Sequence, residues 1–295
     1  MSEKFEIPFK SDMVPKILDD DTKIQFRCHK GISCFNACCK NADITLTPYD
    51  VLRLKKRLGM TSGEFLKQHT VPFEMDGDKV PGIKMRTDDA GACLFVTEEG
   101  CSVYEDRPAA CRYYPVGHLA MKPKDEKTER TSYFLVEEEH CKGHQEAREI
   151  TIGDYRKEQE VAPFDDMNQE WYQIMLKKKS AGPTVGKPPE MSLQLFFMCS
   201  YDLDRFRRFV LSDSFKNSYL LEDETYAELE RDDEALLKFG YRMLKHVLFG
   251  ELSIPERKGI WEKRLEERKE VFDLRREAEI ARKQQAEDDK YKNDV

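Results

Sequence analysis

The spacing of apolar residues changes character about halfway along the chain. In the first half the apolar runs are short and are separated by turn-forming residues, which is typical of short strands and helices. From about Thr151 onward apolar residues recur at helical spacing over long segments. The pattern predicts the α+β class, with a small first half of short strands and helices followed by a mostly helical C-terminal half.

The best-defined element of the first half is a helix over residues 48–58. Thr47 can cap its N-terminus, and Pro48 suits the first helical position because its missing N–H would have no intrahelical partner there. Gly59 is well placed to end the helix in a left-handed conformation. A second short helix is expected around residues 64–69.

Short strands are expected in the rest of the first half. Residues 71–85, with Asp-Gly-Asp in the middle, predict a hairpin or two strands joined by a turn. Residues 94–96 and 102–104 predict a smaller hairpin, and residues 133–136 a last strand. Between the smaller hairpin and the last strand, a single helical turn should carry Cys111.

The second half reads as a series of helices. The first is expected over residues 154–179, with a break near Pro163. Residues 181–189 are rich in proline and glycine and predict a loop or linker. Helices should resume over residues 193–209 and 225–249, where apolar residues lie on one face.

Composition excludes several classes of protein. Charged residues make up 36% of the chain, yet 39% of residues are hydrophobic, which is enough for a packed core. A net charge of −8 argues against a nucleic-acid-coating protein, so no nucleic-acid partner is expected. No apolar run is long enough to span a membrane and the first residues do not resemble a signal peptide, so we expect no membrane partner and a cytoplasmic location.

Cysteines are the strongest chemical signal in the sequence. Eight of the nine fall between positions 28 and 141. In a reducing compartment such thiols are better candidates for metal ligands or redox chemistry than for disulfides. The alternative, that they are small buried hydrophobes, is preferred only for Cys199, which lies in an apolar segment. The predicted metal ligands are Cys28, Cys34, Cys38, Cys39, Cys93, Cys101, Cys111 and Cys141.

The spacing of the thiols leaves the type of centre open. Zinc and iron both favour thiolates gathered from short loops, and Cys34 and Cys38 could point at one metal from a single helical turn. Cys38 and Cys39 are adjacent, and adjacent side chains usually diverge, which favours a polynuclear cluster or two sites. Eight thiolates could complete two four-coordinate sites, or one iron–sulfur cluster with four thiols to spare.

Positive and histidine side chains close to these cysteines in the sequence could support the centre. Basic residues could donate hydrogen bonds to sulfur and offset its charge. A histidine could replace a thiolate, although a surface or supporting role is the favoured interpretation of each lone histidine. The basic candidates are Arg27, His29, Lys30, Lys40, Arg107 and Arg112, and the candidate histidine ligands are His29, His118, His140 and His144.

These residues resemble the YkgJ-type cysteine-cluster family, whose CxxCxxCC domain is described as zinc- or iron-chelating. The resemblance covers about residues 24–145 and implies metal binding without fixing a reaction. The spacing of five and three residues after Cys28 and Cys34 is longer than the family pattern. The matching pieces are Cys34-Phe-Asn-Ala-Cys38-Cys39, Ile44-Thr-Leu-Thr-Pro-Tyr-Asp-Val51, Cys93-Leu-Phe, Gly100-Cys101-Ser-Val-Tyr104, Arg107-Pro108-x-x-Cys111-Arg112-x-x-Pro115 and Cys141-x-Gly143.

With the metal site included, the chain divides into four predicted segments. They are an irregular lead-in over residues 1–23, a cysteine-cluster metal-binding domain over 24–150, a helical region over 151–261, and a charged helix or disordered tail over 262–295.

Three functions are compatible with these features. The first is an iron–sulfur protein, with zinc as the next metal, acting in electron transfer or as an oxidoreductase with a redox or protein partner. The second is a group-transfer enzyme, because the domain is similar to the cysteine-rich part of flagellin lysine-N-methylases; neither a glycine-rich turn nor a Cys-x3-Cys-x2-Cys motif supports it. The third is a zinc-stabilised module whose helical half binds a protein through the apolar side of residues 203–210. Catalytic residues are not assigned by any of the three.

Overall fold

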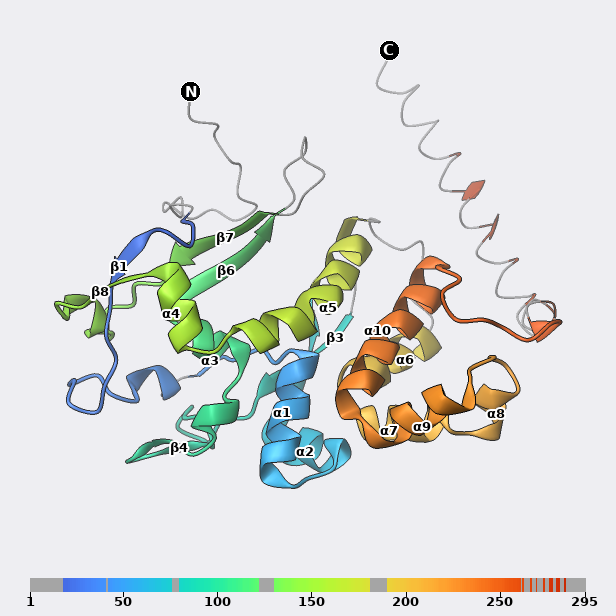
Figure 1. Cartoon of the computed structure of the whole chain (residues 1–295), viewed down its shortest axis with the longest axis horizontal. Coiled ribbons are helices and arrows are strands. Elements are labelled where there is room, and N and C mark those ends of the chain that lie inside the picture. The colour runs from blue at the N-terminus through green and yellow to red at the C-terminus, as the bar shows by residue number, and fades with distance from the viewer. Residues whose placement is uncertain are drawn as a thin grey trace, which may run out of the picture. The chain divides into compact units, whose positions relative to one another are not determined.

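The computed structural model describes residues 18–40, 42–75, 80–121, 130–180 and 190–260, together with single positions between 262 and 284. Short antiparallel strand pairs and helices alternate in the first part of the chain, and helices dominate the later part (Figure 1). The predicted α+β class, with its helical C-terminal half, is therefore confirmed.

Two compact units make up the chain, and neither is continuous in sequence. Unit 1 comprises Met1–Ile44 and Met85–Asp166, and unit 2 comprises Thr45–Lys84 and Met167–Val295. Compactness does not establish which segments fold independently, so the predicted boundaries at residues 23, 150 and 261 stay predictions. The lead-in before residue 18, the turn at 76–79, the linker at 181–189 and most of the tail after 260 lie outside the described residues.

Unit 1 is built on pairs of short strands. The antiparallel pairs are β1 (Lys23–Gln25) with β8 (Glu149–Thr151), β4 (Val96–Thr97) with β5 (Gly100–Cys101), and β6 (Val116–Met121) with β7 (Arg130–Leu135). The β4–β5 hairpin is tighter than predicted, because pairing is confined to the residues beside its turn, where the Thr97 hydroxyl donates to the Gly100 carbonyl at 2.8 Å. Gly117 in β6 lies opposite Phe134, and a Cβ there would lie 2.1 Å from the Phe134 ring.

The helices of unit 1 are short and cover the strand pairs. They are the 3-10 turns η1 (Ala37–Cys39), η2 (Tyr104–Asp106) and η3 (Gly143–Gln145), the helices α3 (Ala109–Tyr113) and α4 (Ile152–Glu158), and the first turn of α5 (Ala162–Ser180). The predicted helical turn carrying Cys111 is α3. The predicted break near Pro163 is also confirmed, since α4 ends at Glu158 and Pro163 lies in the first turn of α5.

One hydrophobic cluster forms the core of unit 1. It joins strand, helix and loop residues from both halves of the unit: Ile24, Phe26, Tyr113, Val116, Tyr133, Ile152, Tyr155 and Val161. Cys141 is partly buried against this cluster. The core is small for the length of chain that it supports, which is the circumstance in which a bound metal adds most to stability.

Unit 2 is helical apart from one strand pair. It contains α1 (Pro48–Leu58), α2 (Ser62–His69), β2 (Thr70–Met75) paired with β3 (Val80–Met85), the later part of α5, α6 (Glu190–Ser200), α7 (Leu203–Val210), α8 (Asp213–Lys216), α9 (Asp223–Arg231) and α10 (Asp233–Phe249). The predicted helix over 193–209 is divided because Asp202 caps a new helix, α7, by accepting from the Arg205 N–H. Asp232 divides the predicted helix over 225–249 in the same way.

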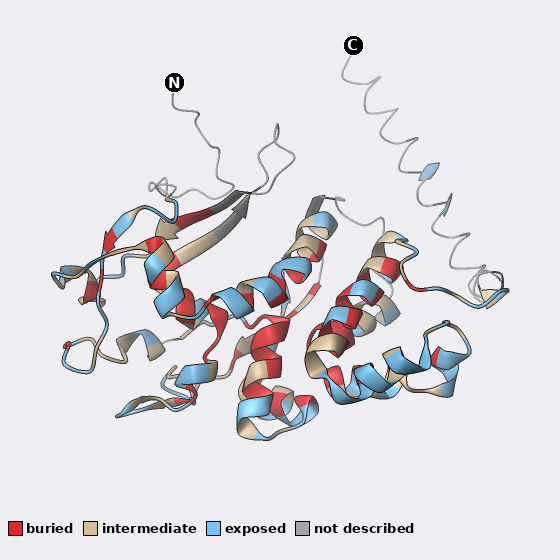
Figure 2. Cartoon of the chain, in the orientation of Figure 1, coloured by how far each residue is buried: buried red, intermediate tan, exposed pale blue. Residues whose placement is uncertain are grey.

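Helix α1 confirms the terminal signals in the sequence. The Thr47 side chain accepts from the Asp50 N–H, and the Asp50 carboxylate accepts from the Thr47 N–H at 2.8 Å, which completes a capping box. Pro48 is the first helical residue, and Gly59 ends the helix at a φ of 63°. The helix is largely buried (Figure 2) and packs in unit 2 against α2 and α10.

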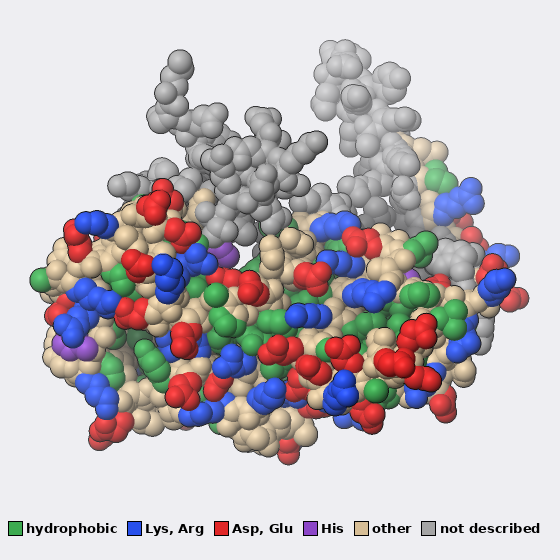
Figure 3. Space-filling view, viewed as in Figure 1, with side chains coloured by type: hydrophobic (Ala, Val, Ile, Leu, Met, Phe, Trp, Pro, Cys, Tyr) green, Lys and Arg blue, Asp and Glu red, His purple; other side chains and the backbone are tan. Residues whose placement is uncertain are grey.

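The apolar side of α7 belongs to the core of unit 2. Leu203, Phe206 and Val210 are buried, and Phe206 stacks on Phe239 of α10 with ring centroids 6.2 Å apart. The side of α7 that the third functional hypothesis assigned to a partner protein is therefore occupied within the unit. Charged side chains of both signs are spread over the face seen in Figure 3. Across the described ranges, no helix is both long enough and apolar enough to cross a membrane.

Candidate metal centre

All eight predicted ligands lie in unit 1. Four of them, Cys28, Cys34, Cys38 and Cys39, lie in residues 28–40, which we call the first cysteine loop. This loop follows β1 and ends in η1, before which Asn36 adopts a left-handed conformation with a φ of 64°. Cys28 and Cys38 are exposed, and the other six predicted ligands are partly buried.

The β4–β5 hairpin holds one side of the first cysteine loop. Asn36 Nδ2 donates to the Thr97 carbonyl at 2.9 Å. The Cys93 N–H, just before the hairpin, donates to the Cys39 carbonyl at 2.8 Å. Cys101 lies within β5, opposite Val96. The hairpin thus brings Cys93 and Cys101 to the end of the loop that carries Cys39.

The turn after Cys141 holds the other side of the loop. The Lys142 N–H donates to Cys34 Sγ at 3.1 Å, and the Arg27 N–H donates to the Gly143 carbonyl at 3.1 Å. Cys141 is thereby placed beside the part of the loop that carries Cys28 and Cys34. The sulfur of Cys34 receives its hydrogen bond from the backbone, a donor that cannot be identified from residue types.

The charge on each thiolate affects its neighbours. Around Cys28, desolvation of the thiol and then the charges of Cys38, Cys34 and Cys141 raise its pKa to about 11. A negative sulfur is therefore disfavoured at this position without a compensating cation. A bound metal ion would reverse that effect, because it stabilises the thiolate.

Cys38 and Cys39 behave differently from the sequence-based expectation that adjacent side chains diverge. In η1 their thiols share a hydrogen bond, which is the largest cause that lowers the pKa of Cys38 to about 7. The same hydrogen bond, followed by burial and by the charges of Cys38, Cys111 and Cys93, raises the pKa of Cys39 strongly.

The remaining thiols extend the same network. Burial raises the pKa of both Cys93 and Cys101, and the charge of Cys38 adds to the effect at each of them. Pairwise interactions of this kind connect all eight predicted ligands. Cys199 lies outside the network, fully buried in α6, as its apolar surroundings predicted.

Tyr114 is an aromatic residue close to the predicted ligands in the sequence, and the structure gives it a polar contact with the site. Its hydroxyl is buried and lies beside the Cys141 thiol and the Glu138 carboxylate. Burial, followed by interactions with Cys141 and Glu138, raises its pKa strongly. A neutral phenol donor beside Cys141 is suited to hydrogen-bond a metal-bound sulfur.

Among the basic candidates, Arg112 holds the backbone and Lys30 forms an ion pair. Arg112 is buried, and it donates to the backbone carbonyls of Arg107 at 3.1 Å, Gln159 at 2.8 Å and Glu105. Lys30 Nζ lies 2.5 Å from a Glu99 carboxylate oxygen. Among the basic candidates, Arg107 has a charge that acts on a thiol. It lowers the pKa of Cys101, although burial of that thiol has the larger, opposite effect.

The four candidate histidines make contacts that fit surface or supporting roles. His118 stacks on Tyr113 with ring centroids 5.4 Å apart. The other three approach polar groups of unit 1: His29 with Glu146 at 3.4 Å, His140 with Glu138 at 3.6 Å, and His144 with the Val136 carbonyl at 3.1 Å.

The donor set fits a thiophilic metal in chemistry, but a finished ligand shell is not formed. Eight thiols share one region and repel one another when ionised, and the Tyr114 hydroxyl lies beside one of them, Cys141. Within the described part of the chain, however, no three histidine, cysteine or acidic side chains lie close enough together to hold one ion. A metal would have to draw the thiols inward, as is usual where binding and local folding are coupled.

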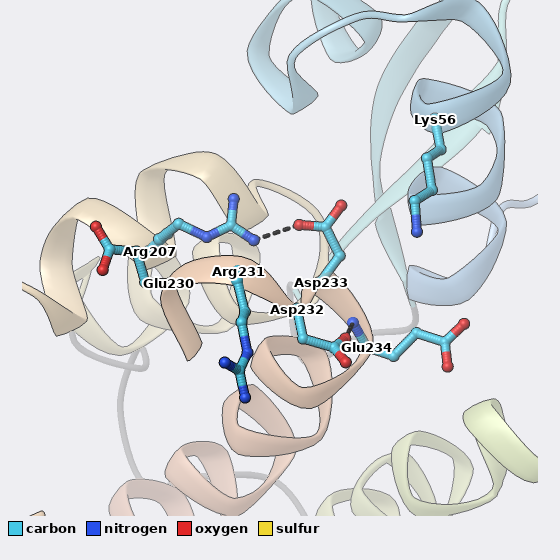
Figure 4. Close-up of a pocket in the computed structure, with 7 residues that line it drawn as sticks. All are labelled: Lys56, Arg207, Glu230, Arg231, Asp232, Asp233 and Glu234. Atoms are coloured by element: carbon cyan, nitrogen blue, oxygen red, sulfur yellow. Dashed lines mark hydrogen bonds and ion pairs between the residues drawn. The ribbon is translucent and has the colours of Figure 1, made fainter. Parts of the chain in front are cut away.

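A separate hollow lies in unit 2. It has a volume of about 370 Å³ and is lined by Lys56, Arg207, Glu230, Arg231, Asp232, Asp233 and Glu234 (Figure 4). Every lining residue is charged and Arg207 is ion-paired with Asp233, so the hollow lacks the apolar walls of a typical small-molecule site.

Comparison with known proteins identifies the domain that contains the thiols. Residues 27–166 match the family model CxxCxxCC, described as "Putative zinc- or iron-chelating domain". No curated protein and no solved structure matches the chain. The matched segment contains all eight thiols, so a metal cofactor is supported. Residues 27–166 of this chain are therefore similar to the CxxCxxCC zinc- or iron-chelating domain.

Proposed function

We propose that the CxxCxxCC domain binds iron as an iron–sulfur cluster and that the protein acts in electron transfer or in a redox reaction. The observation that carries the proposal is the gathering of eight thiols, from loop, hairpin and helix, into one interacting network. The ligands would be Cys28, Cys34, Cys38, Cys39, Cys93, Cys101, Cys111 and Cys141. When bound, the cluster would supply reversible one-electron chemistry.

Two features favour iron–sulfur over zinc. Cys38 and Cys39 are adjacent thiols that share a hydrogen bond, and neighbouring cysteines of one run serve different clusters in two-cluster ferredoxins. Cys28 and Cys38 are exposed, so a cluster beside them would be accessible to a redox partner. A structural zinc site is the second candidate, and the small core of unit 1 favours it.

The cellular location and the partner of the protein are inferred from the same thiol chemistry. Thiols that must stay free for a metal require a reducing compartment, so we place the protein in the cytoplasm. Its partner would be a redox protein that approaches the exposed part of the first cysteine loop.

Metal analysis of the full chain, purified without oxygen, tests the proposal. We expect iron and acid-labile sulfide in similar amounts, with the broad visible absorption of an iron–sulfur cluster that bleaches on reduction. A colourless protein that contains stoichiometric zinc and no sulfide would support the zinc alternative and reject the cluster.

A further inference from the structure

The first cysteine loop contacts a different part of unit 1 on each of its two sides. The eight thiols can be divided into two sets according to the part that lies nearest to them. On one side it contacts the turn after Cys141, and on the other it contacts the β4–β5 hairpin. One metal ion or one cluster is usually completed by four protein ligands. Eight thiols around one centre would therefore leave four ionisable sulfurs crowded together without a cation.

The first set gathers at the turn after Cys141. Two backbone hydrogen bonds fix that turn against the loop, Lys142 N–H to Cys34 Sγ at 3.1 Å and Arg27 N–H to the Gly143 carbonyl at 3.1 Å. Cys28 lies within electrostatic reach of Cys38, Cys34 and Cys141, and Cys38 is the strongest of the three. The Tyr114 hydroxyl also lies on this side, next to Cys141.

The second set gathers at the hairpin. Cys93 donates its N–H to the Cys39 carbonyl at 2.8 Å, and Cys101 is fixed in β5 by its pairing with Val96. Cys39 lies within electrostatic reach of Cys111 and Cys93, and Cys93 within reach of Cys101. Cys111 enters from α3, which follows the hairpin after a short turn.

We propose that the domain holds two metal centres, one bound by Cys28, Cys34, Cys38 and Cys141 and the other by Cys39, Cys93, Cys101 and Cys111. This inference rests on the proposed metal binding and specifies its ligands. Cys38 and Cys39 are neighbours in η1 and belong to different centres, so the two centres adjoin at this dipeptide. Cys38 also interacts with Cys93 and Cys101, which fits a position at the boundary.

Metal counting in paired variants of the full chain tests the division. Cys141→Ala and Cys111→Ala should each lower the bound metal per chain to about half. Removing two ligands of one set, as in C28A/C141A, should lower it no further than the single change does. Removing one ligand of each set, as in C111A/C141A, should abolish binding. C199A is the matched control and should retain the full amount, because Cys199 lies outside the network.

A measurement on the unaltered chain provides a second, independent readout. Metal-free protein titrated with Co(II) without oxygen should develop thiolate-to-cobalt absorption until two equivalents are bound, as two four-thiolate sites require. Saturation at one equivalent, or complete loss of metal from a folded C141A or C111A variant, would overturn the two-centre assignment and leave metal binding intact. A wild-type chain that binds neither iron, zinc nor Co(II) would reject the proposed function itself.

Discussion

Gly143 sets how closely the turn after Cys141 can approach the first cysteine loop. A Cβ at this position would lie 2.5 Å from Cε2 of Phe26 and 3.1 Å from the Arg27 carbonyl oxygen. Phe26 is buried in the core of unit 1, so its ring has little room to move aside. The glycine of the Cys141-x-Gly143 motif is thus required by packing.

The first prediction concerns this glycine. Gly143→Ala should destabilise unit 1 by about 1–3 kcal/mol, the usual cost of overpacking, and should weaken metal retention at the Cys141 side. Urea unfolding and metal content of the purified variant measure the two effects. Gly63→Ala is the control, because a Cβ at Gly63 in α2 meets nothing within 4 Å and alanine is favoured over glycine in a helix. Equal stability of the two variants would contradict the packing argument.

The second prediction concerns Arg112, whose guanidinium bonds three backbone carbonyls while only 1% of the residue is exposed. Arg112→Ala should destabilise the protein by about 3 kcal/mol, because buried acceptors lose their donors. The midpoint of urea unfolding measures the change. Arg205→Ala, which removes an exposed arginine of α7, should have little effect. If the two variants unfolded alike, Arg112 would not have the structural role assigned here.

Residue types identified the candidate ligands, but they could not identify the groups that support them. Arg112 was a candidate donor to sulfur, whereas its guanidinium donates to the backbone carbonyls of Arg107 and Gln159. The Lys142 N–H, which does bond a sulfur, belongs to a backbone group that every residue except proline has. Such partners depend on tertiary contacts between segments that are distant in sequence.

At the scale of elements, a buried ion network joins helices α1, α7 and α10 within unit 2. Lys55 is 6% exposed, and its Nζ lies 3.4 Å from Asp204 and 3.1 Å from Asp233. Arg207 pairs with the same two carboxylates. Burial alone would raise the pKa of both aspartates, but hydrogen bonds from Ser62 and Arg207 and the charge of Lys55 outweigh burial and lower it.

The third prediction follows from that network. Lys55→Met should destabilise unit 2 by about 1–3 kcal/mol at neutral pH, because two partly buried carboxylates lose a buried partner. A carboxylate with a lowered folded-state pKa stabilises the fold above its unfolded value, about 3.9, and the contribution is lost as the pH falls through the folded-state value. The difference from wild type should therefore shrink below about pH 4.

Thermal unfolding followed by helical circular dichroism at pH 7 and pH 3 measures that difference. Lys56→Met is the matched control, since the neighbouring lysine of α1 is exposed. A Lys55→Met deficit that stayed constant between the two pH values would rule out the carboxylates as its origin.

The elements that could be predicted are those specified by nearby residues. The capping box of α1, its glycine end and the break before α5 all depend on residues within one or two turns. Strand β6 was not predicted, because glycine, histidine and alanine give it little strand character and its partner β7 supplies the pairing. The pairing of β1 with β8 sets Ile24 opposite Ile150, and the Lys23 side chain bonds Glu149, 126 residues away, so no local pattern contains it.

At the scale of the whole molecule, the fourth prediction concerns metal removal. Unit 1 has a small core and crowded thiols, whereas unit 2 has an extensive helical core. Stripping the metal with a chelator under reducing conditions should therefore accelerate amide hydrogen exchange in residues 28–40 and 93–111, while helices α6–α10 keep their protection. Uniform loss of protection throughout the chain, or no loss in the cysteine segments, would contradict this expectation.

The helical half and the cysteine-rich half were recognisable from composition alone, but the assignment of residues 45–84 was not. This segment lies between cysteines in the sequence, and its helices nevertheless pack with those of the second half. The reason is local to α1: the Tyr49 N–H donates to Asn168, and Lys55 pairs with Asp204 and Asp233. Those partners follow residue 166, and only the folded chain brings them together.

The end of the family match inside α5 has a practical consequence. Residues 27–166 stop in the first turns of a helix that continues to Ser180. A fragment limited to residues 27–166 would also deprive α1 of its contacts, because Asn168, Asp204 and Asp233 would all be missing from it. The metal-chelating segment therefore cannot be transferred on its own. A graft into another protein would have to include the downstream helices.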